Sequence, residues 1–487
     1  MRYRKGRGVV RATFIVLPLL ITLTVALVGQ FNITDVKPEF SDELWWWQQA
    51  NAVSEYGMPL GYWGYNGGTA KIGTFATWGP AMVLPYGIFG SILGWGYSSY
   101  LYANIFYWIL ANIIFLCLTK PKTKELFFLT VCNLFMITGN CYLFTAMAEC
   151  VRYALGITAV ALIYFLYRHP KCNWGIKYIF IPLFLIYITQ AYLLFGIFFL
   201  FYMICILREF SIYKNLILSG TSFFIFVFAA RKFLRLFSSP YPVVDRRGEL
   251  GGIIDNFTAL KNIFLNQWNF RAYFLCSYFI LLFVIVLYLL WKRRSQKEEL
   301  DKRTYIAALL VLLAFSGGHM ILYNIGEIRG LIVGLIIASY ILCLSKSKKM
   351  QAVFIVCMVI QLLGCKTWCQ NFFEDRFQTS EWKAAVLEME ELLDNIVIVD
   401  SKTDNPWDNT IATYNTGGLE LTPALPKGIA VNSMMNGDTN INAKYAVIGK
   451  EADIIFAEEK IESLEENGFS LKRENEKAAI LVKEHSK

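Results

Sequence analysis

Histidine is scarce in this chain, and charged residues are too few for a protein that is soluble along its whole length. Of 487 residues only three are histidine and 17% are charged, whereas 56% are hydrophobic. The histidines are His169, His319 and His485, and this scatter does not predict a zinc or haem site with imidazole ligands. The sequence also contains no internal repeat and no low-complexity segment.

The cysteines do not form the pattern of a disulfide-rich outer domain. Of the 11 cysteines most lie inside apolar runs, and none follows Cys369. Small secreted domains that depend on disulfides have a denser and more regular cysteine spacing. We therefore expect neither a disulfide framework nor a metal site built from cysteines.

What the sequence has instead is a series of long apolar runs. A hydrocarbon core about 30 Å thick is crossed by a helix of roughly 17–25 mostly apolar residues. With Lys and Arg clusters placed inside, the runs predict an α-helical polytopic membrane protein of about 11 spans with its N-terminus inside. The expected spans are at residues 12–29, 98–118, 126–146, 151–167, 178–190, 191–207, 215–231, 273–291, 305–323, 331–345 and 350–367.

Two segments leave the number of spans open. Residues 180–207 are long for one span and short for two, so we interpret them as a tight hairpin around Thr189 and Gln190. Residues 80–95 are apolar enough for a span, but counting them as one would place the next basic loop outside. We therefore expect a helix along the outer interface, held by the aromatic residues Trp78, Tyr86 and Trp95.

This topology divides the chain into a transmembrane domain, residues 1–369, and a C-terminal domain, residues 370–487, on the outer side. Two loops, of about residues 30–97 and 232–272, also lie outside. After residue 369 acidic residues outnumber basic ones by about ten, although the whole chain has a net charge of +9. The membrane part is therefore strongly basic and the tail acidic.

The tail has the pattern of a small α/β domain. Trp382–Leu393 has apolar residues at helical spacing among charges, which predicts an amphipathic helix. Ile396–Val399 and Tyr445–Ile448 are short apolar runs that predict buried strands. A segment of this length is large enough for one such domain.

An acidic pair, Asp42 and Glu43, begins the first outer loop. Ser41 before the pair favours a helix N-terminus, and Gly57 favours the end of that helix. On this interpretation each carboxylate stabilises the helix start by about 0.3–1 kcal/mol. The alternative is that one of them is a base acting on a substrate that arrives from the bilayer.

Two further pairs of ionisable residues lie at predicted membrane edges. Glu149 and Arg152 are three residues apart, so on a helix they form a local pair. Glu327 and Arg329 flank Ile328 before the tenth predicted span, where they fit an interfacial anchor. Ionisable residues at these depths are also candidates for function, so both interpretations stay open.

The spacing of these residues resembles that of lipid-dependent GT-C glycosyltransferases, which include protein O-mannosyltransferases and bacterial aminoarabinose transferases. In those families an Asp-Glu pair opens the first outer loop, an interfacial helix follows, and a Pro-containing segment leads toward the second span. The resemblance extends to the contexts of Glu149 and Arg329 and covers about residues 1–370 in organisation. Two departures leave the sugar and acceptor open: there is no inserted domain, and Gly79-Pro80-Ala81 replaces a Pro-Pro-Leu.

The resemblance implies transfer of a sugar, a hexose or a pentose, from a polyprenyl-phosphate carrier to an outer acceptor, with inversion. It implies that Asp42 is the general base, with Glu43 beside it, and that Glu149 orients the acceptor or holds a divalent ion. It assigns Arg329 to the donor phosphate. Arg231 and Arg235 are further candidates for this phosphate, because they lie one turn apart on the outer side against the positive-inside trend. The further substrate contacts that we expect are Tyr62, Tyr65, Trp78, Arg152 and Glu327.

The implied partners are the lipid bilayer, the lipid-linked donor and a glycan, lipid or protein acceptor of the cell envelope, without nucleic acid. The implied location is a bacterial plasma membrane. The resemblance implies no particular cofactor, and use of Mg²⁺ or Mn²⁺ stays open. The alternatives are a transporter or flippase of lipid-linked sugars, a polysaccharide polymerase or ligase, and a non-catalytic scaffold. Charges at span ends, rather than deep inside spans, favour an enzyme working at one face.

Overall fold

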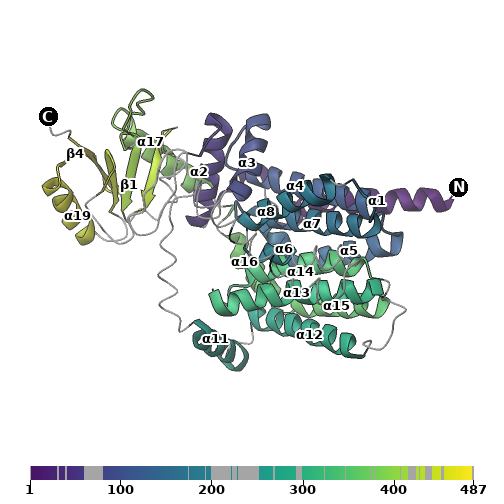
Figure 1. Ribbon diagram of the computed structural model, residues 1–487. Helices are drawn as coiled ribbons and strands as arrows, with labels where there is room; N and C mark the ends of the chain where they lie inside the picture. Colours follow the sequence, from purple (N-terminus) through teal and green to yellow (C-terminus); the bar gives the residue numbers. More distant parts are fainter. Residues whose placement is uncertain are drawn as a thin grey trace.

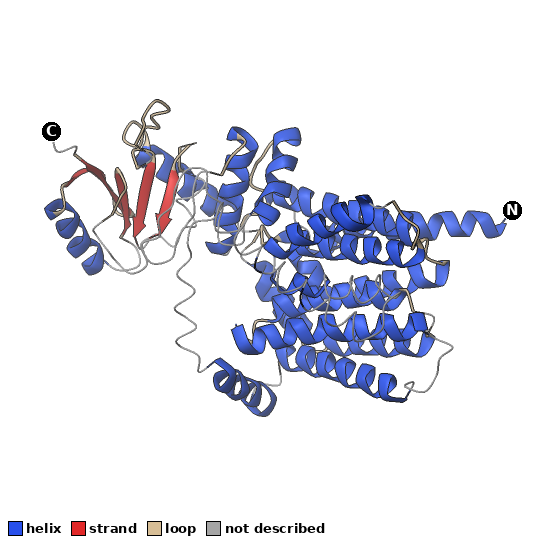
Figure 2. Ribbon diagram, in the orientation of Figure 1, coloured by secondary structure: helices blue, strands red, loops and turns tan. Residues whose placement is uncertain are grey.

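The computed structural model is predominantly helical, with one small sheet near the C-terminus (Figures 1 and 2). The sheet and the N-terminus lie at opposite ends of the helical bundle. The structure describes residues 2–484 apart from 30–31, 39–40, 60–79, 148, 174, 192, 199–251 other than Thr221 and Phe228, 267–268, 292–298, 323, 346, 375, 378, 406, 415–423, 427, 434–440 and 451–453.

Long apolar helices form the body of the molecule. Five are long and apolar enough to cross a membrane in the described part of the chain, or seven if two bent pairs each count as one span. The five helices are α1 (Arg2–Gly29), α4 (Ser99–Thr119), α7 (Glu149–Arg168), α12 (Phe270–Trp291) and α13 (Glu299–Leu322). These helices make the chain a multi-pass membrane protein.

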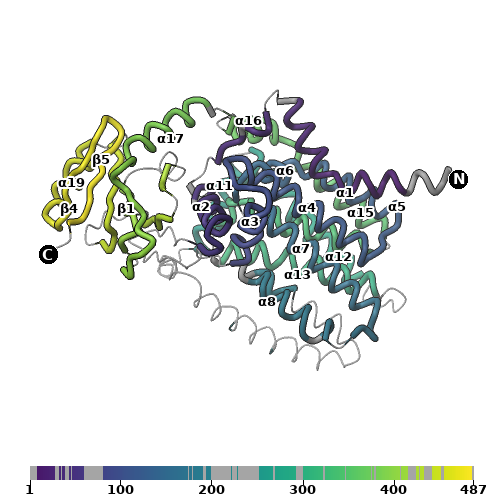
Figure 3. The backbone as a smooth tube through the Cα atoms, turned by 90° about the horizontal axis from the view of Figure 1, so that it is seen from above, coloured from purple at the N-terminus to yellow at the C-terminus, as the bar shows by residue number. Residues whose placement is uncertain are grey.

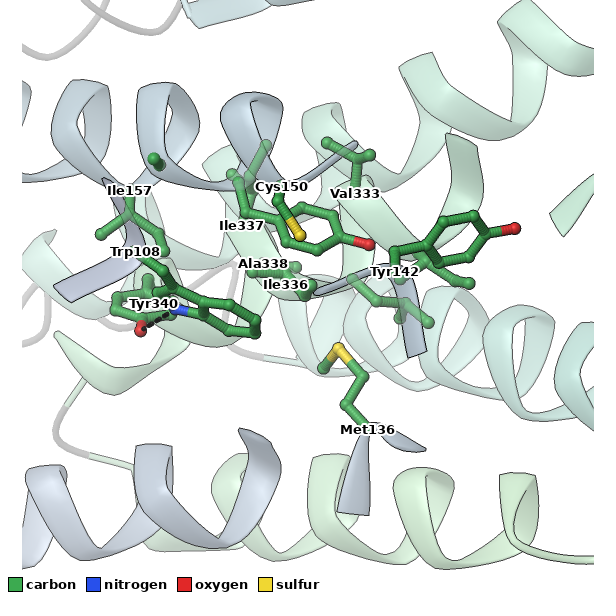
Figure 4. Packing of buried hydrophobic residues seen from close by; sticks show 14 of the residues in the cluster. Trp108, Met136, Tyr142, Cys150, Ile157, Val333, Ile336, Ile337, Ala338 and Tyr340 are labelled. Carbon is green, nitrogen blue, oxygen red and sulfur yellow. Dashed lines mark hydrogen bonds between the residues drawn. The ribbon is translucent and has the colours of Figure 1, made fainter. Parts of the chain in front are cut away.

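The shorter helix α14 (Ile328–Cys343) lies within the bundle. Every residue of α14 except Arg329 is buried. Its Tyr340 hydroxyl donates to Asn112 Oδ1 of α4 at 2.6 Å and accepts from Trp108 Nε1 at 3.5 Å, the contact drawn in Figure 4. Asn112 in turn donates to the Phe14 carbonyl of α1 at 3.1 Å. These bonds satisfy polar groups that would otherwise be costly to bury, and they join three helices.

Two expected spans are bent rather than straight. The expected span 126–146 is α5 (Thr123–Phe135) followed by α6 (Ile137–Cys141) and a 3₁₀ turn, with a bend of 73°. Met136 leaves the helical region there, at φ −82° and ψ 56°. The expected span 350–367 is α15 (Lys348–Gln361) followed by α16 (Cys365–Glu374), bent by 62° where Gly364 has a φ of +76°. Hydropathy predicts both apolar segments but does not predict their bends.

The predicted hairpin and second outer loop are described only in part. A π-helical turn, Ile176–Phe180, runs into α8 (Ile181–Ala191), and a 3₁₀ turn, Leu193–Phe195, follows it. From residue 199 the expected second arm and the span at 215–231 lie almost wholly outside the described residues. Within the loop predicted at 232–272, the described part forms α11 (Gly252–Asn266) and, from Phe270, the start of α12.

The first outer loop contains a 3₁₀ turn, Ile33–Asp35, and two helices, α2 (Ser41–Tyr56) and α3 (Pro80–Leu93). In Figures 1 and 3 α2 and α3 stand between the sheet and the bundle and run across the direction of the bundle helices. The two helices pack closely at Gly87 of α3, where a side chain would not fit: an added Cβ would lie only 2.3 Å from Val53 Cγ1 of α2. As predicted, Gly57 ends α2: its φ is +71° and its N–H bonds the Val53 carbonyl.

A five-stranded sheet follows α17 (Thr379–Leu393), with strand order β2-β1-β3-β5-β4. Strand β1 pairs in parallel with β2 and β3, whereas β5 pairs antiparallel with β3 and β4. The strands are β1 (Thr410–Tyr414), β2 (Ala430–Ser433), β3 (Tyr445–Gly449), β4 (Phe469–Glu474) and β5 (Ala478–Lys483), and α19 (Ile454–Glu466) precedes β4.

Two of the three elements predicted in the tail are confirmed, and one is wrong. The predicted helix is α17, and the predicted strand at Tyr445–Ile448 is the central strand β3. Ile396–Val399 is not a strand. Ile398 is 60% exposed, and its N–H and carbonyl both bond the Tyr445 hydroxyl instead of a neighbouring strand.

Candidate functional site

Three helix N-termini meet around residues 145–147, at the end of the bundle nearest the sheet. Ala146 donates its N–H to Glu43 Oε2, in the first turn of α2, at 3.0 Å. Arg329, in the first turn of α14, lies with Nη1 3.7 Å from Met147 Sδ. Glu149 begins α7. The structure therefore brings the region of the acidic pair, Glu149 and Arg329 to one place.

Glu43 forms a buried ion pair with Arg376, a residue that the sequence analysis did not single out. Glu43 Oε1 lies 2.6 Å from Arg376 Nη2, Glu43 Oε2 lies 3.1 Å from Nη1, and both side chains have no exposed surface. Arg376 also donates to the Phe144 carbonyl at 3.2 Å, and its guanidinium lies over the Phe372 ring. Both oxygens of Glu43 are thus engaged in fixing the start of α2. In the sequence, the only local feature that marks Arg376 as part of such a pair is its position directly after Glu374 and Asp375.

The other expected residues of the first loop are less fully described. Asp42 is the second residue of α2, next to Glu43, and nothing is described of its side chain. The remaining expected residues that lie outside the described part of the chain are Tyr62, Tyr65, Trp78, Arg231 and Arg235. The structure therefore places the backbone of the proposed base but does not place the expected aromatic contacts.

Glu149 and Arg152 form the local pair that their spacing predicts. Glu149 Oε1 lies 3.1 Å from Arg152 Nη1, and both side chains are buried. The second oxygen, Glu149 Oε2, is buried and has no hydrogen-bond partner among the described residues, and the same holds for the Tyr153 hydroxyl. Because buried polar atoms are nearly always satisfied, each of these two atoms is a candidate contact for a ligand or a water molecule.

Arg329 belongs to the same cluster but is more exposed. Its Nε lies 3.8 Å from Glu327 Oε2, with the two side chains 24% and 46% exposed. Tyr142 lies within electrostatic reach of Glu149, Arg329 and Glu327. An ion pair this long and this exposed contributes little to stability.

His319 also belongs to this cluster, although the sequence did not predict it as a site residue. It is buried near the end of α13, within electrostatic reach of Arg152 and Arg329. Its Nδ1 lies 2.8 Å from the Phe315 carbonyl, one turn back, which places the tautomer with hydrogen on Nδ1. An isolated histidine in an apolar span gave no sequence signal for this placement.

Tyr86 of α3 also contacts this cluster, through the backbone of Met147. Its hydroxyl lies 2.5 Å from Asn104 Oδ1 and 3.4 Å from the Met147 carbonyl. Burial raises the pKa of Tyr86, and neighbouring ionisable groups, among them Glu149, raise it further. The phenol therefore stays neutral and acts as a hydrogen-bond donor.

Within the part of the chain that the structure describes, no group of three or more His, Cys, Asp or Glu side chains is arranged to hold a metal ion. Glu149 Oε2 is the described carboxylate oxygen of this cluster that has no partner among described residues. A divalent ion at this place would take further ligands from substrate, water or residues outside the described part.

No protein-family model and no curated protein matches the sequence. Among solved structures, the crystal structure of ArnT from Cupriavidus metallidurans bound to undecaprenyl phosphate superposes with a TM-score of 0.50 and 10% identity, covering 96% of this chain and 98% of that chain. An oligosaccharyltransferase from Archaeoglobus fulgidus, tethered to an acceptor peptide, gives a TM-score of 0.47 and 11% identity, covering 95% of this chain and 72% of that chain. The likeness to ArnT shows that this chain shares the fold of that protein, in agreement with the resemblance seen in the sequence.

Proposed function

We propose that the protein is a membrane glycosyltransferase that moves a hexose or pentose from a polyprenyl-phosphate carrier to a hydroxyl of a cell-envelope acceptor. The observation that carries the proposal is the convergence of the starts of three helices: α2 with Glu43, α7 with Glu149 and Arg152, and α14 with Arg329. Helix N-termini and arginines attract phosphate, and a buried carboxylate can accept a hydrogen bond from a hydroxyl or bind a cation. ArnT, which shares the fold, is bound to undecaprenyl phosphate.

The proposed reaction is a single displacement. Asp42 takes the proton of the acceptor hydroxyl as the oxygen bonds to the anomeric carbon. The bond from that carbon to the phosphate oxygen breaks, and its electron pair leaves on the polyprenyl phosphate. Because the acceptor attacks opposite the leaving group, the anomeric configuration inverts. Arg329, with Arg231 and Arg235, compensates the charge that develops on the departing phosphate.

Glu43 has a positioning role in this proposal. Its two oxygens are occupied by Arg376 and the Ala146 N–H, so it orients the first turn of α2 and hence Asp42. Glu149 offers Oε2 to the acceptor hydroxyl or to a divalent ion. The expected aromatic contacts Tyr62, Tyr65 and Trp78 would line the acceptor path.

The proposed location is a bacterial plasma membrane, with the cluster and the C-terminal sheet on the outer side. The N-terminal end of the bundle is basic, as the cytoplasmic face should be. Val10, Lys124 and Lys348 line one hollow there, so the N-terminal helix meets two of the basic connections at this end. The sheet lies at the opposite end (Figure 1).

Sugar transfer in proteoliposomes tests the proposal. Full-length protein is incubated with a panel of labelled polyprenyl-phosphate sugars and cell-envelope acceptors, and both labelled product and released polyprenyl phosphate are measured. We expect equal amounts of the two, and a loss of about 10²-fold in Glu149→Gln. Glu381→Gln, at an exposed carboxylate of α17, is the matched control. Lipid-linked sugar that crosses the bilayer without any transfer would instead identify a flippase.

A further inference from the structure

Two cysteines from distant parts of the chain lie side by side. Cys141 ends α6 and Cys369 lies in α16, and their Sγ atoms are 3.8 Å apart across a sequence separation of 228 residues. Both are free thiols; Cys141 is buried and Cys369 is partly exposed. A disulfide has an S–S length of about 2.05 Å, so the sulfurs would have to approach by about 1.8 Å more.

The two segments that hold these thiols are packed together along their length. Tyr142 packs on Phe372 with ring centroids 5.8 Å apart, and Phe144 packs on Phe373 at 5.3 Å. Arg376 then donates to the Phe144 carbonyl. Cys141 and Cys369 thus stand at one end of a continuous contact between residues 141–144 and 369–376. Neighbouring contacts hold the two thiols near each other in the reduced protein.

We propose that Cys141 and Cys369 form a redox-responsive disulfide that fastens α6 to α16. The partly exposed Cys369 thiolate attacks an external disulfide, forming a mixed disulfide and releasing one thiol. Cys141 then attacks Cys369 Sγ and displaces the second external thiol. The two cysteines together lose two electrons and two protons, and one external disulfide is reduced to two thiols. The oxidant class is therefore a dithiol–disulfide carrier or an equivalent low-molecular-weight disulfide.

The position of this bond would couple redox state to the start of α2. α16 ends just before Arg376, and residues 137–146 end at the Ala146 N–H, so both partners of Glu43 follow the linked segments directly. Closing so long a loop restricts the unfolded chain and therefore stabilises the folded one. The inference concerns the thiols alone and does not depend on the proposed transferase activity.

Peptide mapping of the full-length protein in its native membranes is the test. The protein is reduced, treated with dithiodipyridine, an apolar disulfide, then blocked with N-ethylmaleimide and digested without reductant. We expect a peptide pair joined at Cys141 and Cys369 that separates on reduction. The linked form should unfold at a temperature higher by roughly 3 °C or more than the reduced form.

Single substitutions give the controls. Cys141→Ser and Cys369→Ser should each remove the linked peptide and the redox-dependent shift, whereas Cys276→Ser, at a partly exposed thiol of α12, should keep both. The inference is overturned if Cys141 is recovered with the maleimide while Cys369 carries the reagent. It is equally overturned if Cys369 is found joined to Cys365, one turn away in α16.

Discussion

Glu43 and Arg376, 333 residues apart in sequence, form an ion pair with no exposed surface on either side chain. The pair joins the first turn of α2 to the residues just after α16, and the Ala146 N–H adds a third segment. This buried charge pair therefore holds together three segments: the first outer loop, the residues after the bend at Met136, and the residues between α16 and α17. A buried pair contributes little net stability relative to an apolar replacement, but loss of one partner leaves an uncompensated charge.

Arg376→Met should therefore destabilise the protein by about 3–5 kcal/mol, because Glu43 would remain buried without its counter-ion. The double variant Glu43→Leu with Arg376→Met should recover most of this loss. Unfolding of the purified protein, followed by the accessibility of its buried thiols, measures both. A double variant as unstable as Arg376→Met would show that the charges themselves are not the cause.

Arg329 should act on the donor rather than on the fold. Its side chain is partly exposed, and its ion pair with Glu327 is long, at 3.8 Å, and weak, so Arg329→Lys should fold normally. Because lysine lacks the planar fork that holds two phosphate oxygens, we expect KM for the lipid-linked donor to rise about 10-fold or more. Arg271→Lys, at an exposed arginine of α12, should leave KM unchanged. An unchanged KM in Arg329→Lys would remove Arg329 from the phosphate site.

Tyr97 and Trp382 should couple the sheet to the first outer loop. Their ring centroids are 4.8 Å apart in an edge-to-face contact, and Tyr97 also stacks on Trp47 of α2. Trp382→Ala should cost about 3–5 kcal/mol and expose α17 to protease before the bundle unfolds. Limited proteolysis with mass spectrometry follows the order of cleavage. Simultaneous cleavage throughout the chain would contradict a separate loosening of this contact.

The sequence predicts local features well and distant pairings poorly. Ser41 and Gly57 mark the limits of α2, and the spacing of Glu149 and Arg152 predicts their ion pair, because these signals act within one or two turns. Hydropathy does not reveal the bend at Met136, since the residues on both sides remain apolar.

The pairing of Glu43 with Arg376 could not be predicted, because nothing local specifies a partner so far along the chain. The same applies to Cys141 and Cys369, because their spacing in the sequence does not indicate that they form a pair. Ile396–Val399 is apolar enough for a strand but is bonded to a side chain instead. Tertiary contacts decide each of these cases, and local propensity only permits them.

Gly428 should tolerate a side chain less well than Gly468. Both have a positive φ, of +92° and +86°, so alanine is strained at either position by about 1 kcal/mol or more. A Cβ at Gly428 would also lie 2.9 Å from Val399 Cγ1, whereas nothing lies within 4 Å at Gly468. Amide exchange in β1 and β3 should therefore rise more in Gly428→Ala. Equal exchange in both variants would mean that Val399 moves away freely.

The central claim is that Asp42 is the base of a sugar transfer from a polyprenyl-phosphate donor. The most direct measurement is the single-turnover rate of transfer in proteoliposomes for wild type, Asp42→Asn and the control Asp255→Asn, at an exposed carboxylate of α11. We predict that Asp42→Asn binds the donor normally and loses about 10²-fold or more in rate, while Asp255→Asn keeps the wild-type rate. Transfer at the wild-type rate by Asp42→Asn would contradict the account and leave Asp42 as a residue that stabilises the start of α2.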